Sequence, residues 1–214
     1  MKQVFSFLFL CTFFLGYTQQ QNLSIDDAVL GYYKGLYPSS LQNLKWIDDT
    51  NNYVFIADNN LTITNAKTTK VVKTLLLNDI QKAYPELKRF PRVMSISATE
   101  LTFRSGNSIE IFNYITNSKT ETIPFDKAAQ NNEFNSKAKA TAYTLDNNLF
   151  IGTPKNPKIS ITSIKDKNIV SGQAIHRSEF GISKGTFWSP EGNFLAFYQK
   201  DESNVTNYPL VDIN

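Results

Sequence analysis

The feature that most constrains the fold is a plan that recurs four times from Trp46 onward. Each copy has a short apolar strand, a polar turn and a second apolar strand. The second strands begin at Tyr53, Leu101, Leu149 and Phe194, so consecutive starts lie 48, 48 and 45 residues apart. A period of 40–50 residues built from strands is typical of stacked or radially arranged β units.

A second hairpin follows the first in each complete copy, which makes four strands per repeat. The additional strands are centred on Thr62, Glu110 and Ser160. Four-stranded antiparallel units at this period are typical of β-propeller blades. We therefore predict an all-β fold, a partial β-propeller of about four blades, over residues 46–214. A β-sandwich or meander with coincidental spacing is the alternative.

Further expectations follow from local patterns. We expect Trp46, Tyr143 and Trp188 at equivalent blade positions, and Phe187, Trp188, Phe194 and Phe197 in the blade core. The segment Leu75–Arg89 has near-helical apolar spacing and predicts a short helix beginning at Asn78 or Asp79. Residues 127–139 are rich in Asn, Ala and Lys and predict a solvent-facing loop.

The N-terminus predicts export. Lys2 precedes an apolar stretch from Val4 to Leu15, and residues 16–18 provide a cleavage region, so residues 1–18 read as a signal peptide. A periplasmic or extracellular location follows. Two alternatives, both membrane-associated, are a lipoprotein signal at Cys11 and an uncleaved anchor. Residues 19–45 predict a helix capped by Ser24 and a lead-in strand.

Composition excludes several function classes. The 22 Lys and Arg and 19 Asp and Glu are interspersed without a basic block, so nothing points to nucleic acid. The only cysteine lies in the predicted signal peptide and the only histidine is His176, so no disulfide, metal site or cofactor is predicted.

The stretch from His176 to Phe197 combines a polar loop with a hairpin. It reads H-R-S-E-F-G-I-S-K-G-T-F-W-S-P-E-G-N-F-L-A-F. Within it, residues 181–185 match the G-x-S-x-G of a nucleophile elbow, which requires a strand, a turn and a helix. A hairpin is expected after Ser183 instead, and no histidine follows it. We therefore predict no catalytic residue in this chain.

That stretch resembles a known family. W-S-P-[DE]-G-x-x-L-A-F is common in the propellers of prolyl oligopeptidase-type serine peptidases and of TolB-like proteins. The longer string, continued by D-E-S-N-V-T-N-Y-P-L-V-D, resembles the dipeptidyl peptidase IV group, including its prolyl tripeptidyl peptidase branch.

The resemblance implies a substrate site on the loop. In the family, acidic residues there bind the free α-amino group of the peptide, which implies that role for Glu179, with His176 and Arg177 supporting the loop. Dipeptidyl peptidase IV usually has two adjacent glutamates, whereas this chain has Arg177-Ser178-Glu179, which fits the tripeptidyl branch better. The alternative is that Glu179 pairs with Arg177 or Lys184 on the surface.

The resemblance also implies a function for the whole. We expect the N-terminal propeller portion of an exported serine exopeptidase that releases Xaa-Pro di- or tripeptides, non-catalytic without a C-terminal α/β-hydrolase domain. The implied partners are peptides with proline at the second or third position, the missing hydrolase domain, and a second copy in a homodimer of the full-length enzyme. The alternative is a free-standing TolB-like binding module of the periplasm.

Overall fold

The computed structural model describes residues 24–36, 40–175 and 179–206. The predicted signal peptide, His176 and Arg177 lie outside these ranges. The chain divides into two compact units, Met1–Ser40 and Leu41–Asn214. Among the helices of the described ranges, none has the length and apolar character needed to cross a membrane.

The first unit contains the predicted capped helix, α2, Ile25–Leu30. The Ser24 hydroxyl accepts a hydrogen bond from the Asp27 amide at 3.0 Å, and the Asp27 carboxylate accepts one from the Ser24 amide at 3.2 Å. This reciprocal pair satisfies two amide groups that a helix start leaves without partners. Lys34 adds an ion pair to Asp27 at 3.0 Å.

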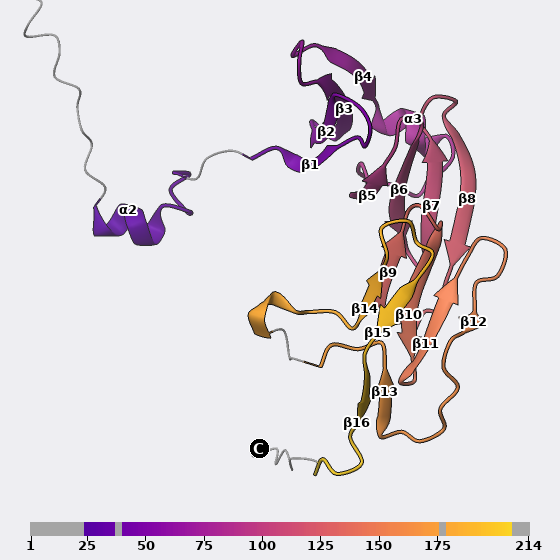
Figure 1. The fold of residues 1–214 in the computed structure, drawn as a ribbon. Coiled ribbons are helices and arrows are strands. Elements are labelled where there is room, and N and C mark those ends of the chain that lie inside the picture. The colour runs from indigo at the N-terminus through magenta and orange to yellow at the C-terminus, as the bar shows by residue number, and fades with distance from the viewer. Residues whose placement is uncertain (1–23, 37–39, 176–178, 207–214) are drawn as a thin grey trace, which may run out of the picture. The chain divides into compact units, whose positions relative to one another are not determined.

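The second unit begins with two four-stranded antiparallel sheets, each a simple meander (Figure 1). The first sheet comprises β1 (Gln42–Trp46), β2 (Asn52–Ala57), β3 (Asn60–Asn65) and β4 (Val71–Leu75). The second comprises β5 (Val93–Ile96), β6 (Glu100–Ser105), β7 (Ser108–Asn113) and β8 (Ser118–Pro124). Both match the predicted repeat strand for strand.

The third sheet differs from the prediction by one strand. It runs β9 (Gln130–Asn135), β10 (Ala140–Leu145), β11 (Asn148–Gly152) and β12 (Ile159–Ser160). The expected loop over residues 127–139 is therefore wrong, because it contains β9. This strand lies at the edge of its sheet and is only partly buried, so its polar sequence carries no apolar signal.

That shift also corrects the expected equivalence of three aromatic residues, because Tyr143 does not match the other two. Tyr143 lies in the second strand of its sheet and is fully buried. Trp46 and Trp188 each end the strand that precedes a hairpin turn, although Trp46 is 64% exposed and Trp188 is partly buried. Repeat spacing found the sheets but not the position of each strand within them.

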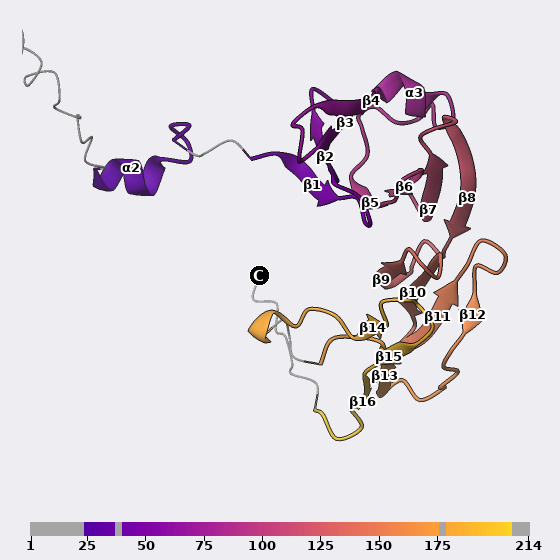
Figure 2. The same cartoon turned by 45° about the horizontal axis from the view of Figure 1, so that its top comes forward.

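Two apolar clusters join neighbouring sheets of this unit, as blades of a propeller pack on one another. The larger one combines Val54 and Leu61 of the first sheet with Leu101 and Phe103 of the second. The smaller one joins Ile109 and Ile123 of the second sheet to Tyr143 of the third. Figure 2 shows these sheets following one another in blade-like succession. The partial β-propeller is thus confirmed.

A short helix lies in the segment that connects the first two sheets, between β4 and β5. α3 spans Leu77–Gln81, so the helix predicted here exists but begins before Asn78. Its Ile80 is fully buried in the larger cluster, and Tyr84 follows it into the same core. Burial of Ile80 and a hydrogen bond from the Leu77 amide to the Asn60 side chain at 3.1 Å together hold this helix in place.

The fourth repeat forms two two-stranded sheets. β13 (Ile169–Ser171) pairs with β16 (Gln199–Asp201), and β14 (Thr186–Trp188) pairs with β15 (Leu195–Phe197). The turn residue Gly192 has φ of 73°, which glycine adopts without steric cost. The expected core is wrong here: Phe194 is 77% exposed, and Phe187, Trp188 and Phe197 are only partly buried.

A candidate substrate-binding loop on the fourth hairpin

The loop between β13 and β14 interrupts what is otherwise one strand. β15 and β16 are separated by Tyr198 alone, so they form a nearly continuous strand. Ser171 lies opposite Gln199, and Thr186 lies opposite Phe197. The chain therefore leaves the strand at Gly172 and returns at Gly185, both beside Tyr198.

Backbone hydrogen bonds close the neck of this loop. The Gly172 amide donates to the Tyr198 carbonyl at 2.8 Å, and the Tyr198 amide donates to the Gly185 carbonyl at 2.9 Å. A Cβ at position 185 would lie 2.1 Å from the Gln173 carbonyl oxygen, so only glycine fits there. Gly172 has φ of 72°, which also favours glycine.

The neck is fixed to the third sheet through Glu133 of β9. The Thr186 hydroxyl donates to the Glu133 carboxylate at 2.6 Å, and Lys184 forms an ion pair with the same carboxylate. The Trp188 indole donates to the Glu133 carbonyl at 3.1 Å. Sequence reasoning missed Glu133, because it falls in the segment expected to be a loop.

The tip of the loop carries the predicted site residue. Glu179 begins a short 3₁₀ turn, Glu179–Gly181, which Figure 1 shows projecting away from the strands. Glu179 is exposed, and no described residue pairs with its carboxylate. Lys184, one of its two expected surface partners, pairs with Glu133 instead. The other expected partner, Arg177, and the loop-support residue His176 lie outside the described residues.

Ser183 lies between this tip and β14. The residue is exposed, and the strand β14 follows it rather than the helix that a nucleophile elbow requires. Within the described ranges there is also no group of three His, Cys, Asp or Glu residues able to hold a metal ion. The described part of the loop therefore offers one unpaired carboxylate, that of Glu179, above a neck held by hydrogen bonds.

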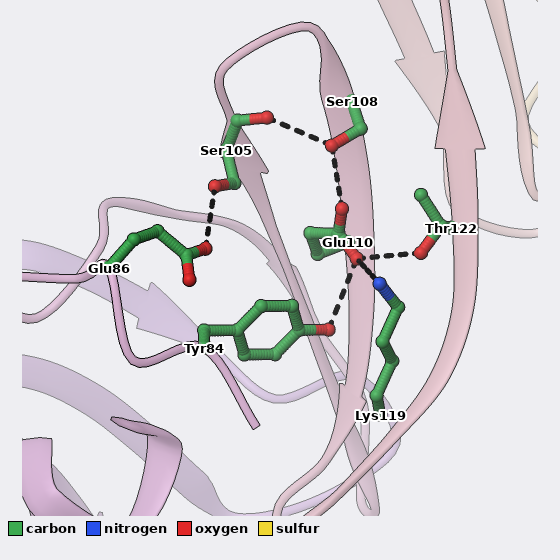
Figure 3. Close-up of polar contacts among 7 residues, drawn as sticks. All are labelled: Tyr84, Glu86, Ser105, Ser108, Glu110, Lys119 and Thr122. Atoms are coloured by element: carbon green, nitrogen blue, oxygen red, sulfur yellow. Dashed lines mark hydrogen bonds and ion pairs between the residues drawn. The ribbon is translucent and has the colours of Figure 1, made fainter. Parts of the chain in front are cut away.

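A second carboxylate, Glu110 of β7, has the opposite surroundings (Figure 3). It is 4% exposed and contacts four donors. They are the hydroxyls of Ser108 at 2.6 Å, Thr122 at 2.7 Å and Tyr84 at 3.2 Å, and the Lys119 ammonium at 3.0 Å. The bond from Tyr84, which follows α3, ties that segment to the second sheet. With four donors already bound, the Glu110 carboxylate has little capacity left for a ligand.

The pKa values of this cluster reflect these contacts. Burial alone would raise the pKa of Glu110, but hydrogen bonds from Ser108, Thr122 and Lys119 outweigh burial and hold that pKa below its ordinary value. Burial, together with the neighbouring Glu110 charge, raises the pKa of Tyr84. Both groups are thereby held in the states, ionised and neutral, that their hydrogen bond requires.

A cleft of about 660 Å³ opens beside the turns that join the first two strands of each of the first three sheets. Trp46, Met94 and Lys137 line it, together with Lys139, which pairs with Glu100 at 3.4 Å and Glu121 at 2.7 Å. The hydrogen bond to Glu121 raises the pKa of Lys139. Glu179, the one predicted site residue within the described ranges, does not line this cleft.

Comparison with known proteins decides the family. The model of the dipeptidyl peptidase IV N-terminal region matches residues 95–214, just over half of the chain. The chain belongs to this family. The match includes the loop, both strands of the fourth hairpin and the Glu110 cluster except Tyr84.

Individual relatives agree with this dipeptidyl peptidase IV N-terminal assignment. The chain is 31% identical over 96 residues to "Probable dipeptidyl-aminopeptidase B" of Ajellomyces capsulatus, and 33% over 75 residues to the protein of the same name from Podospora anserina. These alignments cover 41% and 33% of this chain. The chain spans about a tenth of the length of these relatives, 10% and 8%.

Solved structures give the same picture. A Bacteroides ovatus protein described as a "putative dipeptidyl aminopeptidase IV" is 34% identical with a TM-score of 0.68, over 82% of this chain and 25% of its own. Porphyromonas gingivalis dipeptidyl peptidase 4 is 17% identical with a TM-score of 0.53, over 89% of this chain and 29% of its own. The latter likeness concerns the fold alone.

Proposed function

We propose that this chain is the N-terminal propeller portion of an exported serine exopeptidase, in which the loop carrying Glu179 binds the N-terminus of the peptide substrate. The observation that carries the proposal is the Glu179 carboxylate, exposed and without a described partner, at the tip of a loop whose base is rigidly held. The relatives' names, which are those of dipeptidyl aminopeptidases, supply the reaction class.

The chemistry of the group suits the role. A carboxylate accepts charge-assisted hydrogen bonds from an ammonium, and such bonds are shorter and stronger than neutral ones. Because an exopeptidase must recognise a free terminus, a fixed anion at a set distance from the reacting carbonyl would count residues from that terminus. The proposed products are Xaa-Pro di- or tripeptides, and the single acid in Arg177-Ser178-Glu179 favours the tripeptide.

The catalytic groups would come from a hydrolase domain outside these 214 residues. The loop itself would contribute binding and registration of the substrate and no bond-breaking step. Residues 1–18 support export as a signal peptide, with a periplasmic or extracellular location, and a homodimer of the complete enzyme is part of the same proposal.

The test is Glu179→Gln in the complete peptidase. This change keeps the shape and one acceptor but removes the charge. A hydrogen bond to a charged group contributes about 1.5–3 kcal/mol, so kcat/KM should fall by about one to two orders of magnitude. The loss should appear for Xaa-Pro and Xaa-Xaa-Pro substrates with a free amino terminus.

The control is the N-acetylated form of each substrate, which offers no ammonium. Its slow turnover should be nearly the same for the wild type and Glu179→Gln. An equal fall for both substrates, or for neither, would make Glu179 a structural or surface residue. Absence of peptidase activity in the complete protein, with peptide binding retained, would favour the free-standing binding module.

A further inference from the structure

Phe180, next to Glu179, is in a state that folding alone does not explain. Its side chain is 94% exposed. Its backbone has φ of 53° and ψ of 22°, in the left-handed region. Left-handed backbone is unfavourable for a residue with a bulky side chain, and an exposed phenyl ring gains nothing from burial. The backbone conformation is therefore unfavourable, and burial of the ring does not offset it.

The comparison with Phe194 sharpens this point. Phe194 is also exposed and belongs to the same hairpin, but it is absent from the residues with positive φ. Exposed apolar residues in ordinary conformations are common and need no explanation. Strained backbone at a loop tip, in contrast, clusters at ligand-binding positions.

The surroundings hold Phe180 in place. Gly181 follows with φ of 75°, and the Ile182 amide donates to the Glu179 carbonyl at 3.0 Å. The turn therefore presents the side chains of Glu179 and Phe180 on adjacent residues, whose Cα atoms lie about 3.8 Å apart. A charged group and an apolar ring are thus both exposed at the same tip.

We propose that Phe180 is a specificity-determining residue that contacts the side chain of the first residue of the bound peptide. This inference rests on the proposed function of Glu179. In an α-amino acid the ammonium and the side chain are bonded to the same Cα. A peptide whose ammonium is bound by Glu179 therefore carries its first side chain to within reach of the neighbouring ring.

The contact selects for bulky apolar first residues. An aliphatic side chain packed against one face of a phenyl ring removes apolar surface of both partners from water. A glycine at the first position removes almost none, and an aspartate gains no partner. Because a single exposed ring can cover at most one side of a substrate side chain, we expect a preference of about tenfold for isoleucine over glycine, at the low end of what apolar pockets provide.

The experiment uses the complete peptidase and substrates that differ only in their first residue, Ile, Gly or Asp. The decisive variant is Phe180→Asn, because asparagine adopts the left-handed backbone readily but has no apolar ring. The ratio of kcat/KM for Ile over Gly should fall from about ten to near one. Phe180→Leu, which keeps an apolar side chain, should retain most of the ratio.

Phe194→Asn is the matched control. It removes an exposed phenyl ring from the same hairpin and should leave the Ile over Gly ratio unchanged. An unchanged ratio in Phe180→Asn, or an equal fall in kcat/KM for all three substrates, would overturn the proposal and make Phe180 a structural residue of the turn.

Glu179→Gln separates failure of this inference from failure of the proposed function. If Glu179→Gln lowers turnover of free peptides but Phe180→Asn leaves the ratio intact, only the role of Phe180 is refuted. If Glu179→Gln has no effect on free peptides, or the complete protein has no peptidase activity, the proposed function fails and this inference falls with it.

Discussion

One carboxylate of the second sheet, that of Glu110, and one of the loop between β13 and β14, that of Glu179, have opposite surroundings. In the second sheet, Glu110 is buried with four donors, and the surrounding Ile109 and Ile111 are buried as well. In the loop between β13 and β14, Glu179 is exposed and lies outside both apolar clusters. The Glu110 carboxylate is fully used in contacts within the protein, whereas the Glu179 carboxylate remains available to bind a ligand.

The difference separates a structural acid from a candidate binding acid. A buried carboxylate is tolerated only when its hydrogen bonds are made, which removes its capacity for a ligand. An exposed carboxylate on a fixed base costs the fold little and keeps that capacity. Glu133 is an intermediate case. It is partly buried, and its carboxylate binds Thr186 and Lys184 at the base of the loop. Mutations at these positions should therefore differ in rank.

The largest effect is expected for Glu110→Ala. It leaves Tyr84, Thr122 and Lys119 facing a cavity, and removing one member of a buried charged cluster is strongly destabilising. Because Lys119 is partly exposed and can turn to water, we expect a loss of about 3 kcal/mol in the free energy of unfolding, measured by urea titration. Glu86→Ala, an exposed neighbour, should change it by less than about 0.5 kcal/mol.

Acid should reproduce part of that loss. The pKa of Glu110 in the folded chain lies below its ordinary value of 4.5. Its ionised form therefore contributes stability that is present above about pH 4.5 and is lost as the pH falls through the lowered folded-state pKa. The stability difference between wild type and Glu110→Gln should shrink over that range. A difference that is independent of pH between 6 and 2 would contradict the assigned ionisation.

A smaller effect is expected for Glu133→Gln. The change removes the ion pair with Lys184 and weakens the hydrogen bond from Thr186, for a loss of about 1 kcal/mol. The Tyr198 amide, which closes the loop neck, should exchange its hydrogen several-fold faster. Glu202→Gln, which removes the exposed pair with Lys200, is the control and should leave that exchange rate unchanged.

A small effect on stability is also expected from deleting residues 173–185, although the deletion removes the ion pair of Lys184 with Glu133. Gly172 would then precede Thr186 directly and would be the single residue opposite Tyr198. Its amide could donate to the Tyr198 carbonyl, and its carbonyl could accept from the Tyr198 amide in place of that of Gly185. The free energy of unfolding should stay within about 1 kcal/mol of the wild-type value in urea titrations, because a surface excursion contributes little to the core. A loss above about 3 kcal/mol would show that the loop is structural.

Much of the fold was predictable because apolar spacing reports burial directly. Val54, Leu101 and Leu149 are fully buried at the positions the repeat indicated. The failures have the same origin. β9 is a partly buried edge strand with a polar sequence, so apolar spacing did not reveal it. Phe194 is apolar but exposed, so the same spacing wrongly placed it in the core.

The candidate site was predictable only in part. Glu179 came from the resemblance of the whole segment, not from any local rule about acids. The neck was not predicted, since glycines at positions 172 and 185 reveal their role only when the chain between them is seen to return to its starting point beside Tyr198. Glu133 lies far from the loop in sequence, and nothing in its surroundings indicated the contact.

The interrupted strand has a consequence for how such a protein can change. Where a loop leaves and re-enters a sheet opposite one and the same residue, its length and sequence are decoupled from the pairing on either side. Substitutions, insertions or whole replacements between Gly172 and Gly185 would then change the side chains at the tip and leave the strand pairing unchanged. The strand pairs on either side of Tyr198 can thus carry loops of different length and sequence, through natural variation or by design.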